Sequence, residues 1–246
     1  MKYKASDFQK SMPAWKIERD SIADKVLYRR ISYIAAAFMA NKKIKANDVS
    51  IFSIFVGIIS VLLIGVPSYR SGLAGSILLI FWIILDDTDG NIARVAGSQP
   101  YGEYLDAVSS YILIGFLFFS LGIRSYFMSG QNQTWNIIFV ILGGTASVCG
   151  VLMSLMYQKF VQVSLEYHKN ERLEYDFSNS SPMMKLKTKI DMNMSVGGFL
   201  PLLVLLAIAV NRSEIVVVIW FFYYFFEFIA TAAYFVIKTK TFSIEE

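Results

Sequence analysis

The most chemically informative residues of the sequence are carboxylates that begin at the end of an apolar run, 76–85. A first stripe at helical spacing consists of Asp86, Asp89, Gly90 and Ala93. A second stripe consists of Gly102, Asp106 and Ser110. Residues three or four apart share a helix face, and the short link 95–101 predicts that the two helices are antiparallel neighbours. Ionised groups are costly within a membrane, so we expect these carboxylates to surround a polar cavity near one membrane face.

The three carboxylates predict a site for a divalent cation. Asp86, Asp89 and Asp106 would supply the oxygen ligands that Mg²⁺ or Mn²⁺ prefers, and such an ion neutralises the charge of phosphate groups. The alternative is that these aspartates cap helices or pair with Arg94. This alternative suits Asp87, which points away from the stripe.

The neighbouring residues predict a nucleotide-binding surface. Gly90, Ala93 and Gly102 have little or no side chain, so a nucleotide could approach the backbone there. Arg94 offers a planar cation for phosphate. Asn47, which precedes the first long apolar run, is suited to a plain helix N-cap.

The combined pattern resembles the signature of the CDP-alcohol phosphotransferase family, which is D-x-x-D-G-x-x-A-R, a short spacer and G-x-x-x-D-x-x-x-D. The matching residues are Asp86, Asp89, Gly90, Ala93, Arg94, Gly102 and Asp106. The resemblance implies that these positions hold the CDP group and Mg²⁺ or Mn²⁺, in a site for two ions. The segment from Asn47 to Ser50 is also similar to the family's Asn-x-x-Thr/Ser entry before its first membrane helix, which implies a second interpretation of Asn47, a role in nucleotide binding at the active site. It also implies a homodimer in a bacterial plasma membrane. The implied reaction moves a substituted phosphate from a CDP-linked donor to an alcohol, polyol or lipid acceptor and releases CMP, as in phospholipid or glycan biosynthesis.

Ser110 departs from this signature, in which an aspartate helps to bind metal and accepts the proton of the attacking hydroxyl. Serine is not a base at neutral pH without help, and three explanations remain open. The chain is a catalytically degenerate relative that binds nucleotide or lipid; another carboxylate, with Glu103 the nearest, replaces the base; or the acceptor needs no base. A phosphate acceptor such as polyprenyl phosphate has no proton to lose, and it would suit a different nucleotide-sugar donor.

The composition predicts an all-α integral membrane protein. Hydrophobic residues make up 55% of the chain and the mean hydropathy is +0.50, which argues against an ordinary soluble domain. Apolar stretches near the length that spans a bilayer are found at 49–66, 73–94, 103–123, 135–157, 196–211 and 214–237. We therefore predict six transmembrane helices within a catalytic domain at 47–240, with the motif 86–110 on the second and third helices.

Residues 1–46 are predicted to form a cytoplasmic segment that contains an interfacial amphipathic helix. The first part, 1–16, is polar and is expected to be loose. From about 18 to 40 apolar residues recur near helical spacing, namely Ile22, Val26, Ile31, Ile34 and Phe38. Basic residues between them, including Arg29, would face anionic membrane lipid. An amphipathic helix packed on the rest of the protein is the alternative.

The distribution of basic residues predicts that both termini are cytoplasmic. Lysine and arginine crowd the N-terminal segment, a predicted loop at 158–194 and the tail, whereas the opposite loops hold Arg70, Arg124 and Arg212. A soluble nucleotide could then reach the motif. The loop contains the single histidine, His168, and the cations Lys185, Lys187 and Lys189, which are either a topology signal or part of an acceptor pocket.

Two further residues lie within apolar stretches. Glu227 is predicted to be too deep for the metal site, and it would either hydrogen-bond to another helix or border an acceptor pocket. Cys149 is expected to be a small buried residue. A transporter is the alternative from another functional class, but it would place its ionisable groups near the bilayer midplane. No nucleic-acid partner is expected.

Overall fold

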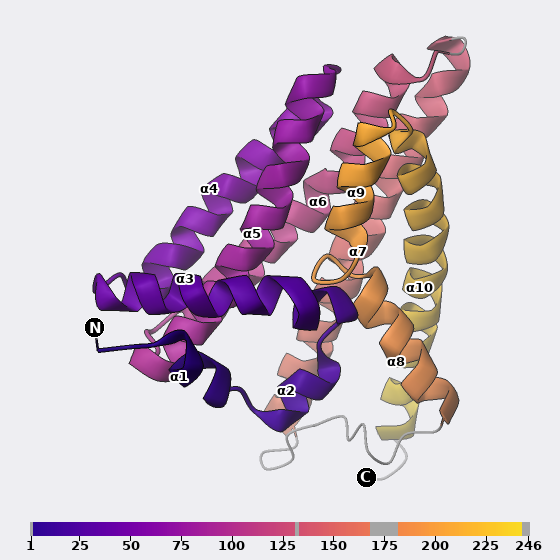
Figure 1. Cartoon of the computed structure of the whole chain (residues 1–246). Helices are drawn as coiled ribbons and strands as arrows, with labels where there is room; N and C mark the ends of the chain where they lie inside the picture. Colours follow the sequence, from indigo (N-terminus) through magenta and orange to yellow (C-terminus); the bar gives the residue numbers. More distant parts are fainter. Residues whose placement is uncertain (1, 131–132, 168–181, 243–246) are drawn as a thin grey trace.

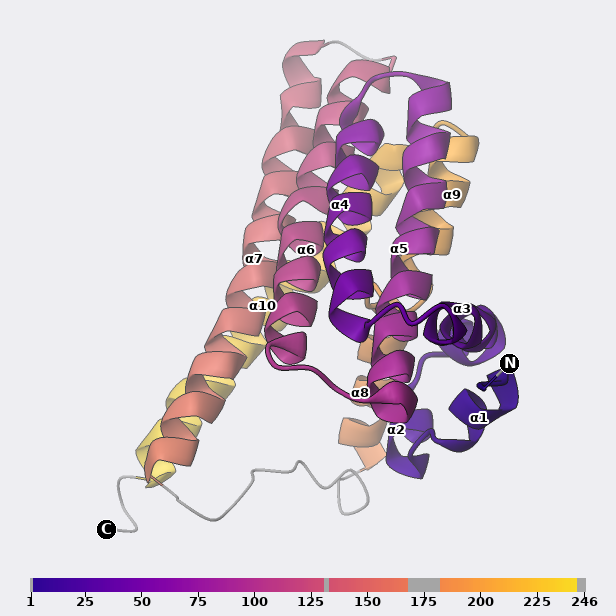
Figure 2. The same ribbon diagram turned by 90° about the vertical axis from the view of Figure 1, so that its left-hand side faces the viewer.

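The computed structural model describes residues 2–130, 133–167 and 182–242, and every regular element within these ranges is a helix. Figure 1 shows long helices that run side by side, with α3 (Arg29–Asn41) lying across them near one end. In the perpendicular view of Figure 2, α3 is seen end-on beside α5 (Tyr69–Ala96). The predicted all-α fold is confirmed for the described residues.

Five helices are long and apolar enough to cross a membrane, which supports an integral membrane protein. They are α4 (Ala46–Gly65), α5, α6 (Gly102–Met128), α7 (Gln133–Tyr167) and α10 (Ser213–Phe242). The remaining predicted stretch, 196–211, contains α9 (Leu200–Ala209). Its 10 residues rise only about 15 Å, half the thickness of a hydrocarbon core of about 30 Å. Helix length alone therefore supports five spans rather than six.

The N-terminal segment is more ordered than the sequence predicts. It consists of α1 (Ala5–Lys10), α2 (Ala14–Arg19), a π-helical turn η1 (Asp24–Tyr28) and α3. The expectation of a loose 1–16 is wrong, because α1 packs against α3 and Phe8 is fully buried. Burial of this one aromatic side chain anchors the segment to the bundle.

The amphipathic region presents its apolar side chains outward. More than half of the surface is exposed for Ile22, Val26, Ile34 and Phe38. The inward face carries small residues such as Ala36, which is fully buried. Arg29 is also buried, at 5% exposure, so the prediction that this arginine faces lipid is wrong. Carboxylates inside the protein surround it, as described below.

Close backbone contact joins α6 to α7. A Cβ atom built at Gly143 would overlap the carbonyl group of Phe118, and one built at Gly122 would overlap that of Phe139. A Cβ atom built at the neighbouring Gly144 would make only an ordinary contact, 3.6 Å from a side-chain carbon of Phe119. Gly143 thus lets the backbones of the two helices approach closely, as small residues do in membrane helix interfaces.

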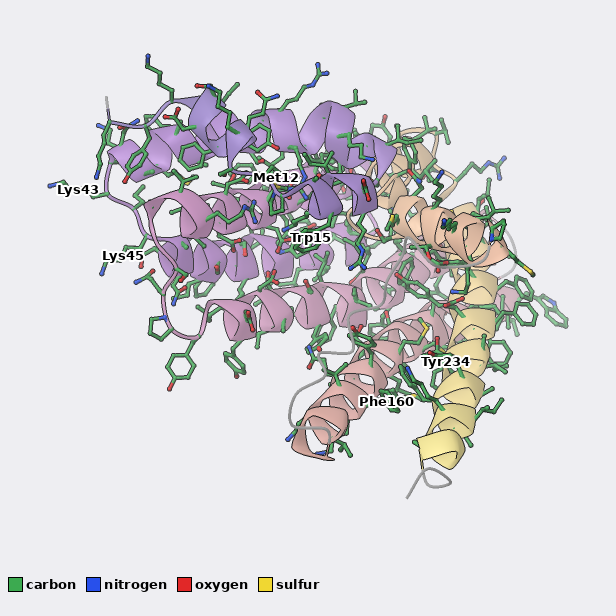
Figure 3. All side chains as sticks on the ribbon, turned by 90° about the horizontal axis from the view of Figure 1, so that it is seen from below. Met12, Trp15, Lys43, Lys45, Phe160 and Tyr234 are labelled. Carbon is green, nitrogen blue, oxygen red and sulfur yellow. The ribbon has the colours of Figure 1, made fainter. Side chains whose placement is uncertain are left out.

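The predicted loop at 158–194 is helical at both ends. Helix α7 continues to Tyr167, and α8 (Pro182–Met194) occupies the other end. An ion pair of 2.7 Å between Lys187 and Asp191, one turn apart, favours the helix. In Figure 3, Phe160 of α7 and Tyr234 of α10 lie between α7 and α10. His168 falls outside the described residues.

Two other predictions concern buried groups. Cys149 is buried, as expected. Arg124 was assigned to a loop, but it lies within α6 at 1% exposure. Its Nη1 donates hydrogen bonds of 3.0 Å to the carbonyls of Val66 and Ser68, in the turn between α4 and α5. These bonds join α6 to that turn, and they give a buried cation hydrogen-bond partners inside the protein.

Candidate functional site

A cavity of about 870 Å³ lies where α4 begins, α5 ends and α6 begins, with α2 beside it. We call it the motif cavity. Its lining includes the predicted residues Asn47, Asp89, Gly90, Ala93, Arg94, Gly102, Glu103 and Asp106. Figure 2 shows these helix ends at the same end of the bundle as α2. The antiparallel arrangement predicted from the short link therefore brings most of the motif to one place.

Asp89 is the most firmly positioned carboxylate of the motif cavity. It is 7% exposed, and its Oδ2 accepts a hydrogen bond of 2.6 Å from the Ser50 hydroxyl. Asp106 reaches the same cavity from α6 and is exposed. A buried carboxylate and an exposed one thus face a common space from two helices.

Asp86 and Ser110 do not line the motif cavity. Within the described part of the chain, no three His, Cys, Asp or Glu side chains are grouped closely enough to hold a metal ion. The donor chemistry nevertheless fits Mg²⁺ or Mn²⁺. Asp86 Oδ1 is buried without a hydrogen-bond partner, and an unsatisfied carboxylate oxygen is suited to a hard cation.

Two cationic side chains face the motif cavity. Arg94 Nη2 donates a hydrogen bond of 2.6 Å to Asn91 Oδ1, while its Nε is buried without a partner. Asn91 in turn donates to Ser32 on α3, at 2.9 Å. Lys16 reaches the cavity from α2. Burial, followed by the charges of Arg94 and Arg29, lowers the pKa of Lys16, and a bound anion would relieve this repulsion.

Sequence reasoning missed Lys16 as a site residue. It lies in the segment that was expected to be loose, and no motif marks it. Ser50, which donates a hydrogen bond to Asp89, lies one turn after Asn47 on α4, and this helical spacing is a signal that could have found it. Only the tertiary structure, which sets α2 beside the motif cavity, brings Lys16 to the motif.

Asn47 connects α4 to the link between α5 and α6. Its Nδ2 donates a hydrogen bond of 2.8 Å to the carbonyl of Pro100, and its backbone N–H donates to Gln99 Oε1 at 3.2 Å. The N-cap of α4 is Lys45, so the plain-cap interpretation of Asn47 is wrong. Asn47 Oδ1 is buried without a partner.

Asp87 points away from the motif cavity, as predicted, but its partner is Arg29. The Arg29 Nη1 to Asp87 Oδ1 distance is 3.2 Å. The same guanidinium contacts both oxygens of Asp20 and, at 3.4 Å, one oxygen of Asp24. Burial, together with the charge of Asp87, raises the pKa of Asp24 to about 8. The ion pairs of Arg29 with these carboxylates join η1 and α3 to α5.

Glu227 forms a separate polar cluster. Its Oε1 lies 2.5 Å from Lys187 Nζ on α8. Lys187 also pairs with Asp191, which accepts a hydrogen bond of 2.9 Å from the Tyr223 hydroxyl. The expectation that Glu227 bonds to another helix is confirmed. These residues do not line the motif cavity.

A comparison of the chain with models of known protein families finds no match, and a comparison with curated proteins finds none either.

Proposed function

We propose that this protein is a divalent-metal-dependent membrane transferase of the CDP-alcohol phosphotransferase type. It would transfer a substituted phosphate from a CDP-linked donor to an alcohol or lipid acceptor and release CMP. The observation that carries the proposal is the convergence of Asp89, Asp106 and Arg94 on one cavity. Acids together with a cation suit a nucleoside diphosphate, whose transfer depends on positioning and charge neutralisation.

The residues have distinct roles in this proposal. Asp86, Asp89 and Asp106 would hold the divalent ion, which neutralises phosphate charge when it is bound. Arg94 and Lys16 bind the negatively charged phosphate oxygens. Gly102 leaves the nucleotide room beside Asn47, because a Cβ atom there would lie 3.4 Å from Asn47 Oδ1.

The reaction requires one proton acceptor. The acceptor hydroxyl oxygen forms a bond to the transferred phosphorus, the bond from this phosphorus to the CMP oxygen breaks, and CMP leaves with the electron pair. Glu103, which lines the motif cavity, takes the hydroxyl proton in place of the family's aspartate. Ser110 is half-buried and outside the cavity lining, which favours Glu103 over the residue at the family's position.

A second candidate is transfer from a nucleotide-sugar donor to a phosphate acceptor. The observation in its favour is the presence of both Lys16 and Arg94 in the motif cavity, together with Ser110 at the position of the family's base. Two cations can bind a phosphate acceptor, and such an acceptor needs no base. Glu103→Gln separates the candidates: it should abolish turnover with hydroxyl acceptors if the first is correct, and it should leave transfer to a phosphate acceptor unchanged if the second is correct.

The proposal includes an orientation in the membrane. The motif cavity would face the cytoplasm, with α3 at the interface and its outward apolar side chains in the lipid. Helix α9 and the turn before it would complete a sixth crossing. Helix α5, at 28 residues, rises about 42 Å, longer than a hydrocarbon core of about 30 Å. Its last turns, which carry Asp89 and Arg94, can therefore reach the aqueous face.

The test is thermal stabilisation of the purified protein by nucleotides. CDP with Mg²⁺ or Mn²⁺ should raise the melting temperature, and UDP should not. Asp89→Asn should abolish the metal-dependent part of the rise in melting temperature with CDP, because it removes the buried carboxylate. Asp48→Asn is the matched control: Asp48 lies near the site on α4 but does not line the motif cavity. A UDP-specific response would favour the second candidate, and an unaltered response in Asp89→Asn would contradict the site.

A further inference from the structure

A second cavity, of about 470 Å³, lies beside the motif cavity. Its walls are residues 2–3, the turn from α3 into α4, and the end of α5 with the residues that follow. Ser98 and Gln99 line both cavities. Two compartments therefore share one wall, which is the link that Asn47 fastens to α4.

The second cavity has a strongly positive lining. Its ionisable lining residues, apart from Tyr3, are Lys2, Lys43 and Lys45, and the described lining includes no Asp or Glu. Ser98 and Gln99 add hydrogen-bonding groups. Figure 3 shows Lys43 and Lys45 at one edge of the molecule, with side chains that extend outward beside the turn. These ammonium groups therefore stand at the rim, where an anion would enter.

The side chain of Asn41 joins the N-terminal wall of the cavity to α3. Asn41 Oδ1 accepts hydrogen bonds from the backbone N–H of Lys2 and of Tyr3, at 2.8 and 3.1 Å. Its Nδ2 donates to the carbonyls of Tyr3 and Ala37, at 2.8 and 2.7 Å. The start of the chain is thereby fixed against the end of α3, which keeps Lys2 at the cavity.

Lys43 occupies a position where lysine is unfavourable for the backbone. Its φ is 62°, in the left-handed region. The N–H of Lys43 bonds to Ala40 and that of Ile44 to Met39, both at 3.0 Å. These two bonds form the helix-ending motif in which the left-handed residue is usually glycine and sometimes asparagine. Lysine is costlier there than either of these residues, so the backbone conformation does not explain a lysine at this position. An anion bound in the cavity would explain its positive charge.

We propose that this second cavity binds a phosphate group, either that of an anionic lipid headgroup or a free phosphate. Lys43 and Lys2 would contact the phosphate oxygens, with Lys45 at the rim. The site is separate from the motif cavity and does not depend on the proposed transferase activity. Because both cavities share Ser98 and Gln99, a bound phosphate would also fix the wall of the motif cavity.

The test uses Lys43→Asn in the full-length protein, with Lys42→Asn as the matched control. Both variants remove one positive charge, but Lys42 does not line the second cavity. Asparagine tolerates the left-handed conformation, so Lys43→Asn should keep or raise the melting temperature without ligand. Stabilisation by inorganic phosphate should require about three- to tenfold more phosphate in Lys43→Asn. Lys42→Asn should respond like the unaltered protein.

A third variant, Lys16→Gln, shows whether phosphate stabilises the protein through the second cavity or through the motif cavity. Stabilisation by phosphate should survive in Lys16→Gln and weaken in Lys43→Asn. The reverse pattern, or no response in the unaltered protein to phosphate or lipid, would overturn the proposal. Phosphatidylglycerol vesicles that stabilise more than phosphate, with phosphatidylcholine vesicles inert, would identify a lipid headgroup as the source. The CDP response of the motif cavity is measured separately, so failure of one proposal is distinguishable from failure of the other.

Discussion

The hydroxyl of Ser50 on α4 donates a hydrogen bond of 2.6 Å to Oδ2 of Asp89 on α5. Both side chains are buried, at 3% and 7% exposure. This bond orients a carboxylate that lines the motif cavity. In the proposed metal site, loss of a group that orients a ligand should lower metal affinity by about tenfold or more.

Ser50→Ala should therefore weaken the binding of a divalent metal ion at the proposed site. We expect the apparent affinity for Mg²⁺ or Mn²⁺ to fall about tenfold and the free energy of unfolding to fall by about 1 kcal/mol. A metal titration monitored by CDP-dependent melting measures the first effect. Ser53→Ala is the control, because Ser53 is also buried on α4 but pairs with Ser109, at 3.2 Å. Equal metal affinities in the two variants would argue against an orienting role for Ser50.

Lys16→Gln should weaken nucleotide binding without unfolding the protein. Lys16 lines the motif cavity and is only half-buried, so its loss should cost little stability and about three- to tenfold in CDP affinity. Lys10→Gln removes an exposed lysine of α1 at equal charge and should leave CDP affinity unchanged. If both variants lost affinity alike, the effect would be one of net charge rather than of contact.

Two of the aspartates that contact Arg29 should affect the stability of the protein in opposite ways when they are neutralised. The pKa of Asp24 is raised from 3.8 to about 8 in the folded protein, so the folded state binds this proton more tightly than the unfolded state. Stability should consequently fall as the pH rises from about 4 to about 8. Asp24→Asn should flatten this part of the pH–melting curve and be more stable than the unaltered protein above pH 8.

Asp20→Asn should instead destabilise the protein at every pH in this range. Asp20 contacts Arg29 through both of its oxygens, and its neutralisation removes a partner of a buried charge, at a cost of about 3 kcal/mol. Melting curves of the two variants across pH compare them directly. Parallel curves for Asp24→Asn and the unaltered protein would show that Asp24 does not titrate in this window.

Gly143→Ala should destabilise the contact between α6 and α7. The added methyl group would overlap the Phe118 carbonyl, and separating the helices should cost about 1–3 kcal/mol. Gly144→Ala places the same methyl group at an ordinary contact distance and should be close to neutral. Melting temperatures in detergent test the pair, and equal losses would contradict the close approach.

Helical spacing and hydropathy were sufficient to predict the long helices. The starts and ends of α4, α5 and α10 lie within a few residues of the predicted stretches, because an apolar run of spanning length has few alternatives to a helix. The spacing of Asp89, Gly90 and Ala93 also placed them correctly on one face. Residues 1–16 and 182–194 were misjudged because their helices are short and polar, so packing rather than composition stabilises them.

The sequence by itself determined the helical membrane character of the protein and the stripe of small and acidic residues on α5, since both follow from local periodicity. Only the tertiary structure decided which groups share a space. It brought Lys16 and Ser50 to the motif, turned Arg29 inward to Asp87, left Ser110 outside the cavity lining and paired Glu227 with Lys187. These contacts join residues that are distant in the chain. They depend on how whole helices pack together, and no local sequence pattern encodes that packing.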